Sequence, residues 1–198
     1  MILNRRAFVF GGLAVTAAAL AGCQTVPTTY EHAELTYAHL PPYQLLVREI
    51  VVDQSYVSPS QKPNVEHLFD VSPAQASAQW ARDRLKAEGN ENILNFVIKD
   101  AAVTEDKLEK QKGITGLFTY DQSERYKGVL EVELQVLNDQ GFKEASVLAR
   151  AERSVTVAEN IKLREREKIW FQLTEDLMTE IDRQLQQGIA KHLNRFVL

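Results

Sequence analysis

The most regular pattern in this chain lies between Tyr126 and Val157, where the sequence is YKGVLEVELQVLNDQGFKEASVLARAERSVTV. In its first half an apolar row alternates with a polar row; the apolar row is Leu130, Val132, Leu134 and Val136, and the polar row is Glu131, Glu133 and Gln135. Residues 142–157 carry a second apolar row, Ala145, Val147, Ala149 and Ala151, with Lys143, Ser146, Arg150 and Glu152 elsewhere. Alternation is typical of half-buried strands, and Asn138-Asp139-Gln140-Gly141 has the composition of a turn. The pattern predicts a hairpin of strands 126–137 and 142–157, with acids on one strand opposite bases on the other.

Two further strands and two helices are predicted around this hairpin. Apolar and β-branched residues predict strands over 44–53 and 93–103. Ser72-Pro73-Ala74-Gln75 has the composition of a capping box and predicts a helix start, and Gly89-Asn90 predicts its end. A long helix is predicted over 161–196 from one apolar stripe, formed by Trp170, Leu173, Leu177, Ile181, Leu185, Ile189, Leu193 and Phe196.

The element order β-α-β-β-β-α predicts an α+β fold. We expect a mostly antiparallel four-stranded sheet, packed by two helices on one face and polar on the other. A helix of ~35 residues spans roughly 50 Å, which exceeds what a small sheet covers. One end is therefore expected to overhang, to break at Gly188 or to contact a partner, and Leu185 and Ile189 are candidate contact residues.

The connection over 104–125 is polar except for a small apolar patch. Gly113 and Gly116 flank this patch, whose candidate contact residues are Ile114, Leu117 and Phe118. A connection this long is a loop or an extended β-arm. Its apolar tip either inserts into a membrane or a partner protein, or folds back on the domain.

The N-terminus has the features of a processing segment. Arg5-Arg6 precedes an uncharged stretch, Ala7–Leu20, which is shorter than the roughly 20 apolar residues of a membrane-spanning helix. It ends in Leu20-Ala21-Gly22-Cys23, which resembles the lipobox of bacterial lipoproteins. The resemblance implies a signal peptide over 1–22 and acyl chains on Cys23, which would become the first residue. An uncleaved anchor with a free thiol is the alternative.

The segment Asn4-Arg5-Arg6-Ala7-Phe8 also resembles a twin-arginine export signal, in which Arg5, Arg6 and Phe8 are the matching residues. General secretory export is the alternative. Gln24 follows the cysteine in place of an Asp, and by the same resemblance to lipoproteins this favours the outer membrane over the inner membrane.

The charge and domain organisation limit the kinds of partner. Cleavage would remove two of the 23 basic residues and none of the 27 acidic ones, which changes the net charge from −4 to −6. An acidic domain repels nucleic acid, so we expect contact with the membrane through the lipid and with an envelope protein. Residues 23–42 are proline-containing and without sustained periodicity, which predicts a lipidated tether. Residues 43–198 are predicted to form a single periplasmic domain.

No catalytic or metal-binding constellation stands out in the sequence. Cys23 is the only cysteine, which excludes an intrachain disulfide and a Cys-rich metal site. His67 and Asp70 lie three residues apart, and Glu131 and Glu133 share a strand face, but a solvated loop and a solvated strand explain these pairs more simply. We expect no enzymatic activity, no metal and no cofactor beyond the covalent lipid.

The order of elements behind a lipidated cysteine resembles the accessory lipoprotein of the lipopolysaccharide-transport barrel, over residues 44–196. The resemblance implies a non-enzymatic accessory or assembly module of an envelope complex. A second resemblance is to the auxiliary lipoproteins of lipid-transporting ABC systems. It implies the alternative function of a lipid or small-ligand carrier with an apolar slot between the sheet and the long helix. An envelope hydrolase that uses His67 and Asp70 is the remote alternative.

Overall fold

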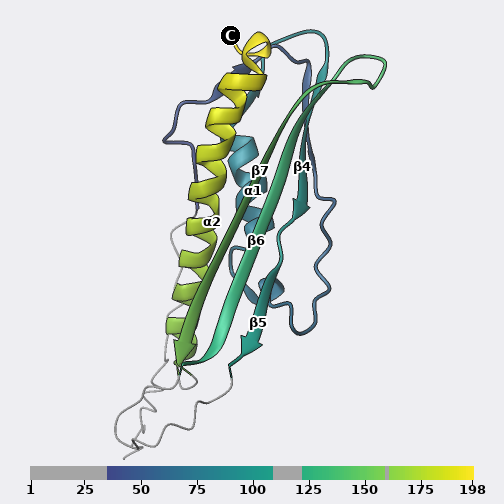
Figure 1. Ribbon diagram of the computed structural model, residues 1–198. Helices are drawn as coiled ribbons and strands as arrows, with labels where there is room; N and C mark the ends of the chain where they lie inside the picture. Colours follow the sequence, from purple (N-terminus) through teal and green to yellow (C-terminus); the bar gives the residue numbers. More distant parts are fainter. Residues whose placement is uncertain (1–34, 109–121, 159–160) are drawn as a thin grey trace, which may run out of the picture. The chain divides into compact units, whose positions relative to one another are not determined.

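The structure is a computed structural model that describes residues 35–108, 122–158 and 161–198 (Figure 1). Its helices are α1 (Pro73–Arg84) and α2 (Leu163–His192), with 3-10 turns at Glu66–Leu68 and Asn194–Phe196. Its strands are β1 (Tyr43–Leu45), β2 (Glu49–Asp53), β3 (Leu85–Ala87), β4 (Ile93–Asp100), β5 (Val103–Lys107), β6 (Gln122–Leu137) and β7 (Lys143–Ala158). The predicted α+β class with a long C-terminal helix is confirmed.

The main sheet has five strands and is mixed rather than mostly antiparallel. Strands β4 and β5 follow one another along the same edge of β6, and β7 pairs with the other edge. The sheet is therefore four strands wide, as predicted, although it contains one strand more. Strand β2 pairs parallel to β4, because the chain crosses over through α1 between them and enters both strands from the same end.

The predicted strand over 44–53 is wrong as a single element. Strand β1 pairs with β3 in a separate two-stranded sheet, and only β2 joins the main sheet. Helix α1 ends at Arg84 rather than near Gly89, because the next residues form β3. Gly89 allows two backbones to approach, since a Cβ there would lie 2.5 Å from the carbonyl carbon of Leu46.

The predicted hairpin is confirmed and extended at its open end. Strands β6 and β7 each have 16 residues, which at about 3.3 Å per residue span roughly 53 Å. Helix α2 has 30 residues and spans about 45 Å, and it continues through Gly188. The expected overhang is therefore wrong, because the hairpin is as long as the helix that packs on it.

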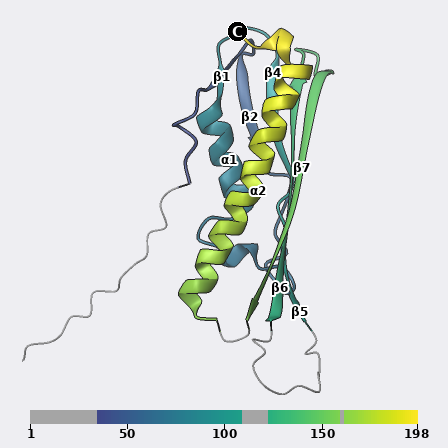
Figure 2. The same ribbon diagram turned by 60° about the vertical axis from the view of Figure 1, so that its left-hand side comes forward.

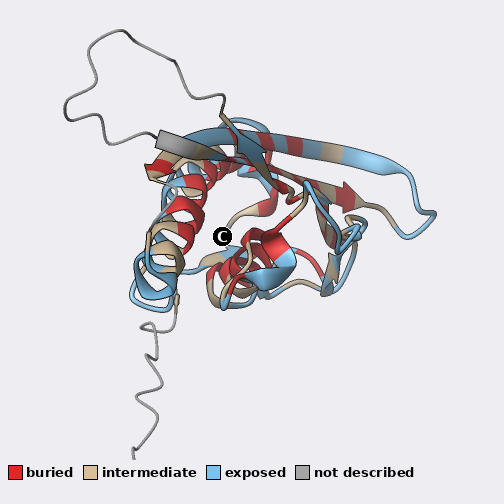
Figure 3. Ribbon diagram, turned by 90° about the horizontal axis from the view of Figure 1, so that it is seen from below, coloured by how far each residue is buried: buried red, intermediate tan, exposed pale blue. Residues whose placement is uncertain are grey.

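Both helices lie on one side of the main sheet (Figure 2). Seen from below, the buried residues lie where the helices and the sheet face each other (Figure 3). The side chains of Leu185 and Ile189 are 0% and 2% exposed in this core. Their predicted role as partner-contact residues is therefore corrected: the stripe that contains them packs against the sheet.

The contact between α2 and the hairpin is close. A Cβ added to Gly188 would clash with the side chain of Val147, and one added to Gly128 would lie 2.8 Å from Leu177 Cδ1. The apolar slot that the carrier alternative places between the sheet and the long helix is thus filled by side chains along these contacts.

Candidate functional site

Residues Leu35–Pro42, here named the strap, pack against the helices. The Tyr37 side chain is 9% exposed, and its backbone N–H donates to Asp83 Oδ2 at 2.8 Å. The guanidinium of Arg84 donates to the backbone of the strap at Pro41. The predicted tether over 23–42 therefore extends too far, since the folded domain already includes Leu35.

A cavity of about 410 Å³, here named the strap pocket, lies between the strap and α2. Its lining combines apolar and acidic side chains, among them Leu40, Phe171, Met178, Tyr37, Glu175 and Asp182. Asp182 Oδ1 accepts a hydrogen bond of 2.7 Å from Trp80 Nε1 and lies 3.7 Å from the Nε of Arg84. The pocket thus has an acidic wall on α2 that is held in place from α1.

The hydroxyl of Tyr37 is buried in this region and has no hydrogen-bond partner among the described residues. Burial, followed by the negative charges of Asp182, Glu175 and Asp83, raises the pKa of Tyr37 above its usual value. The hydroxyl therefore stays protonated, with both its donor and its acceptor capacity unused.

A second cavity, of about 240 Å³, lies beside the buried carboxylate of Glu66. Glu66 is 3% exposed and accepts hydrogen bonds from Tyr56 Oη at 2.6 Å, Ser58 Oγ at 2.5 Å and the Val103 amide at 3.0 Å. Burial alone would raise the pKa of Glu66, but these bonds outweigh it and hold the pKa below its usual range. The carboxylate is therefore an ionised, fully engaged acceptor that ties the 55–66 loop to β5.

The pair formed by His67 and Asp70 does not line one cavity. His67 is exposed and borders the Glu66 cavity, whereas Asp70 borders a small pocket beside Phe69 and Trp170. The geometry that the hydrolase alternative needs, with imidazole and carboxylate facing one space, is not present in these two pockets.

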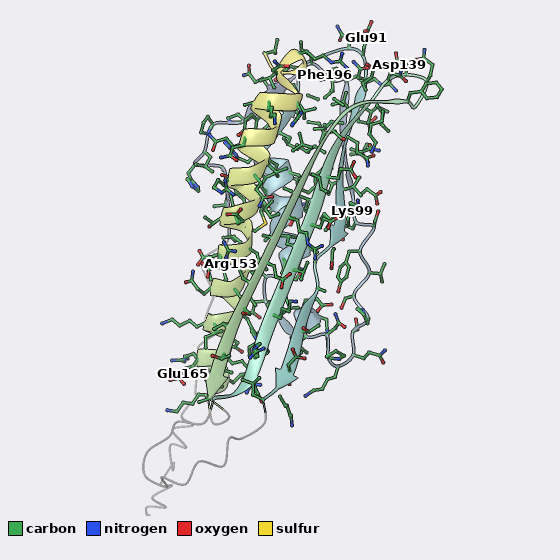
Figure 4. All side chains as sticks on the ribbon, viewed as in Figure 1. Glu91, Lys99, Asp139, Arg153, Glu165 and Phe196 are labelled. Carbon is green, nitrogen blue, oxygen red and sulfur yellow. The ribbon has the colours of Figure 1, made fainter. Side chains whose placement is uncertain are left out.

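The face of the main sheet opposite the helices is here named the open face, since no described helix packs on it, and it carries an ion-pair network. Glu131 lies 2.7 Å from Arg150 and 3.5 Å from Lys99, which Figure 4 labels beside β4. Glu133 lies 2.9 Å from Lys143 and 3.5 Å from Lys99. The cross-strand acid-base pairing predicted for the hairpin is confirmed by Glu131 and Arg150.

The two open-face carboxylates are held ionised. The hydrogen bond from Arg150 is the largest influence that lowers the pKa of Glu131. Burial opposes ionisation at Glu133, but the hydrogen bond from Lys143 and nearby positive charge still lower its pKa. Both carboxylates are salt-bridged anions, which does not suit a pair that must exchange protons with a substrate.

Exposed apolar side chains accompany these charges. Leu148 is 57% exposed in the polar row of β7, and Phe142 is 71% exposed beside the turn of the hairpin. Sequence reasoning did not single them out. The alternation in the sequence does mark Leu148, because it is the one leucine in a polar row otherwise formed by Ser146, Arg150 and Glu152.

A charged cluster lies at the start of α2, around Arg166. Arg166 lies 2.9 Å from Glu124 and 3.9 Å from Glu105. The Tyr126 hydroxyl lies 3.1 Å from an oxygen of each carboxylate and can donate its one proton to either. Trp80 and Trp170 are core residues, and Trp170 belongs to the apolar stripe predicted for the last helix. The cluster around Arg166 joins α2 to β5 and β6 at the end of the sheet where the chain leaves the described residues.

Several predicted site residues lie outside the described residues: Arg5, Arg6, Phe8, Cys23, Ile114, Leu117 and Phe118. Among the described residues, no cluster of His, Cys, Asp and Glu is arranged to hold a metal ion. Within that same part of the chain, no helix has the length and apolar character needed to span a membrane.

Comparisons with known proteins add little to this picture. No family model matches the sequence, and no curated protein matches it. A crystal structure of a minor lipoprotein from Acinetobacter baumannii is 16% identical to this chain, with a TM-score of 0.36 over 77% of this chain and 96% of that one. A TM-score this low does not establish a shared fold. The resemblances to the lipopolysaccharide-transport lipoprotein and to the ABC-system lipoproteins therefore remain predictions.

Proposed function

We propose that this protein is a lipid-anchored lipoprotein of the bacterial envelope whose domain acts as a non-enzymatic accessory or assembly module. In this proposal the open face docks on an envelope protein, with the outer membrane as the site of anchoring. The main support is the one-sided fold: both helices and the strap lie on one side of the main sheet, and no other described element covers the opposite side (Figure 2).

The open face has the dimensions of a small protein interface. The spacing between β6 and β7 runs for roughly 53 Å, that between β6 and the β4–β5 edge for about 46 Å, and that between β2 and β4 for about 17 Å. At about 4.8 Å per spacing these enclose ~560 Å². A standard interface buries about 800 Å² per partner, and transient ones bury under about 600 Å². The side chains also suit docking, since Glu131, Arg150 and Lys143 are already fixed by ion pairs and Leu148 offers exposed apolar surface.

Position-resolved photo-crosslinking in the protein's own cells tests the docking proposal. A photoreactive residue is placed at Ser146, at Leu148 or, as the control, at Gln187, an exposed position on α2. We expect the two open-face positions to give one common adduct with an envelope protein and Gln187 to give none. An adduct from Gln187 that equals those from the open face would contradict docking through this face.

The anchor is tested separately by metabolic labelling with palmitate. We expect the wild-type chain to carry label and to sediment with membranes, and the Cys23→Ser variant to lose both properties. An unlabelled wild-type chain would refute the lipoprotein assignment whatever the crosslinking shows.

A further inference from the structure

Strand β2 has an edge that no described segment covers. The edge of β5 is paired with residues 63–65, through the bridge between Asn64 and Thr104 and two main-chain hydrogen bonds. The edge of β7 is partly capped by Gln184. Strand β2 ends the strand order, and within the described part of the chain its main chain is hydrogen-bonded to β4 alone. Its other edge therefore offers N–H and C=O groups with which an added strand can pair.

The side chains of β2 connect this edge to the open face. Three exposed side chains, those of Glu49, Val51 and Asp53, alternate with two half-buried ones. The register places Asp53 in one row with Val97 of β4 and Glu133 of β6, so the exposed side chains of β2 continue the open face. Val51 is 38% exposed. A strand added beside β2 would thus border the open face and cover apolar surface at Val51.

The charges along β2 indicate which strand would fit. Neither Glu49 nor Asp53 has an ion-pair partner among the residues that the structure describes, and Asp53 accepts a hydrogen bond of 3.2 Å from the Ser55 hydroxyl. The two acids are four residues, or about 13 Å, apart on one face. An extended segment with Lys or Arg at positions i and i+4 would place one cation opposite each carboxylate, and such cross-strand pairs are stabilising.

The same charges disfavour a second copy of this chain at the edge. Antiparallel pairing of two β2 strands about Val51 would place Glu49 of each copy opposite Asp53 of the other. In-register parallel pairing would place each acid opposite its equivalent. Like charges directly opposite each other destabilise a strand pair, so the edge favours a basic strand from a different protein.

We propose that the free edge of β2 binds an extended basic segment of the envelope partner, which joins the main sheet as an added strand with Lys or Arg opposite Glu49 and Asp53. The inference rests on the proposed function for the existence of that partner, and it names the chemistry of the segment that is recognised. Main-chain hydrogen bonds would supply the affinity, and the alternate side chains the specificity.

Calorimetric titration of the full-length protein in a non-ionic detergent tests the proposal. The probe is the peptide acetyl-Lys-Val-Thr-Val-Lys-amide, and its acidic counterpart has Glu in both Lys positions. We expect saturable binding of the basic peptide at one site and at least tenfold weaker binding of the acidic peptide. Equal affinities for the two peptides, or no saturable binding of the basic one, would overturn the proposal.

Backbone methylation of the probe separates strand addition from simple charge attraction. One isomer is N-methylated at its two valines and the other at its lysines and threonine, so each isomer keeps N–H groups along only one edge. Because an added strand pairs through one edge, we expect one isomer to lose at least tenfold in affinity and the other to stay within threefold of the parent peptide. Equal affinities for the two isomers would contradict pairing with a strand.

A charge swap locates the binding site on β2. The double variant Glu49→Lys, Asp53→Lys should bind the acidic peptide at least tenfold more tightly than the basic one. Asp176→Lys changes an exposed acid on α2 and should keep the wild-type preference. An unchanged preference in the double variant, or the same reversal in Asp176→Lys, would overturn the assignment to β2. Thermal melting confirms that each variant is folded.

The peptide titration and the cellular crosslinking can fail separately. Adducts from Ser146 and Leu148 without peptide binding would keep docking by the open face and refute strand addition at β2. Peptide binding without those adducts would keep the β2 site and refute docking by the open face.

Discussion

The Glu66 carboxylate is buried, and hydrogen bonds from neighbouring groups stabilise its ionised form. In the wild-type protein the Tyr56 and Ser58 hydroxyls donate to one carboxylate oxygen and the Val103 amide donates to the other. Replacement by Gln removes the charge and leaves one acceptor oxygen, so an NH₂ group faces the donors on one of the two sides. We expect Glu66→Gln to lower the free energy of unfolding by about 2–4 kcal/mol, because buried donors lose a charged acceptor. Urea denaturation measures the loss. The exposed Glu88→Gln should stay within about 0.5 kcal/mol of wild type.

The same carboxylate contributes to acid sensitivity. Its pKa is lower in the folded state than its ordinary value, so the unfolded chain binds a proton first as the pH falls. The stability that Glu66 contributes is present above about pH 4.3 and is lost as the pH drops through the folded pKa. The free energy of unfolding, measured from pH 6 to pH 3, should decrease less steeply with falling pH for Glu66→Gln than for wild type. Equal slopes would contradict the lowered pKa.

Gly89 is the glycine at which a side chain has no room. A Cβ there would lie 2.5 and 2.6 Å from backbone atoms of Leu46 and Val47, which side-chain rotation cannot relieve. We expect Gly89→Ala to destabilise the domain by about 3 kcal/mol. Gly141→Ala is the comparison, since its φ of +83° is strained but nothing lies within 4 Å, and it should cost only about 1 kcal/mol. Chemical denaturation of both variants measures their free energies of unfolding and shows whether Gly89→Ala is the more destabilising of the two.

At the scale of elements, β7 has a free edge that α2 partly covers. Gln184 accepts from the Arg150 amide and donates to the Arg150 carbonyl, both at 2.9 Å, as a neighbouring strand would. Capping an edge in this way limits pairing with other chains.

Hydrogen exchange at the Arg150 amide tests this edge contact. Gln184→Leu removes the acceptor, and we expect exchange of that amide to accelerate at least tenfold. Gln184→Glu keeps an acceptor and loses only the donor, so the amide should stay protected. Equal exchange rates in the two variants would show that the packing of α2, and not the amide, protects the edge.

Local patterns predicted the elements, and remote contacts decided where they end. The alternation over 126–157 and the capping box at Ser72 needed only near neighbours, and both are confirmed. The break after Leu45 depends on β3 and on an isolated bridge to Val197. No pattern within residues 44–53 contains this information.

The candidate sites likewise divide into one that local sequence patterns predict and one that depends on remote contacts. The ion pairs of the open face follow from the hairpin register, which the sequence predicts. The strap pocket does not, because Tyr37 lies in a proline-flanked segment without periodicity and gains its role only where α2 faces it. Leu185 and Ile189 were misplaced because an apolar stripe is the same in sequence whether it covers a sheet or a partner.

At the scale of the whole molecule, the domain has two sides with different surfaces. The helical side holds the strap and its pocket, and the other side presents the ion pairs and Leu148 of the open face. If the open face docks as proposed, docking is separable from folding at Leu148 and Arg150, because both side chains are exposed and contribute little to the core.

The most direct test of docking by the open face compares two exposed leucines. Leu148 lies on the open face and Leu163 at the first turn of α2, where they are 57% and 66% exposed. Near a helix N-terminus an Asp is favourable, whereas at position 148 it lies opposite Glu133 and should cost up to about 1 kcal/mol. Thermal melting checks that both variants are folded. The measurement is the yield of the Ser146 photo-adduct in cells. We expect the adduct to be lost in Leu148→Asp and to form normally in Leu163→Asp. Normal adduct formation in both variants would contradict docking through the open face.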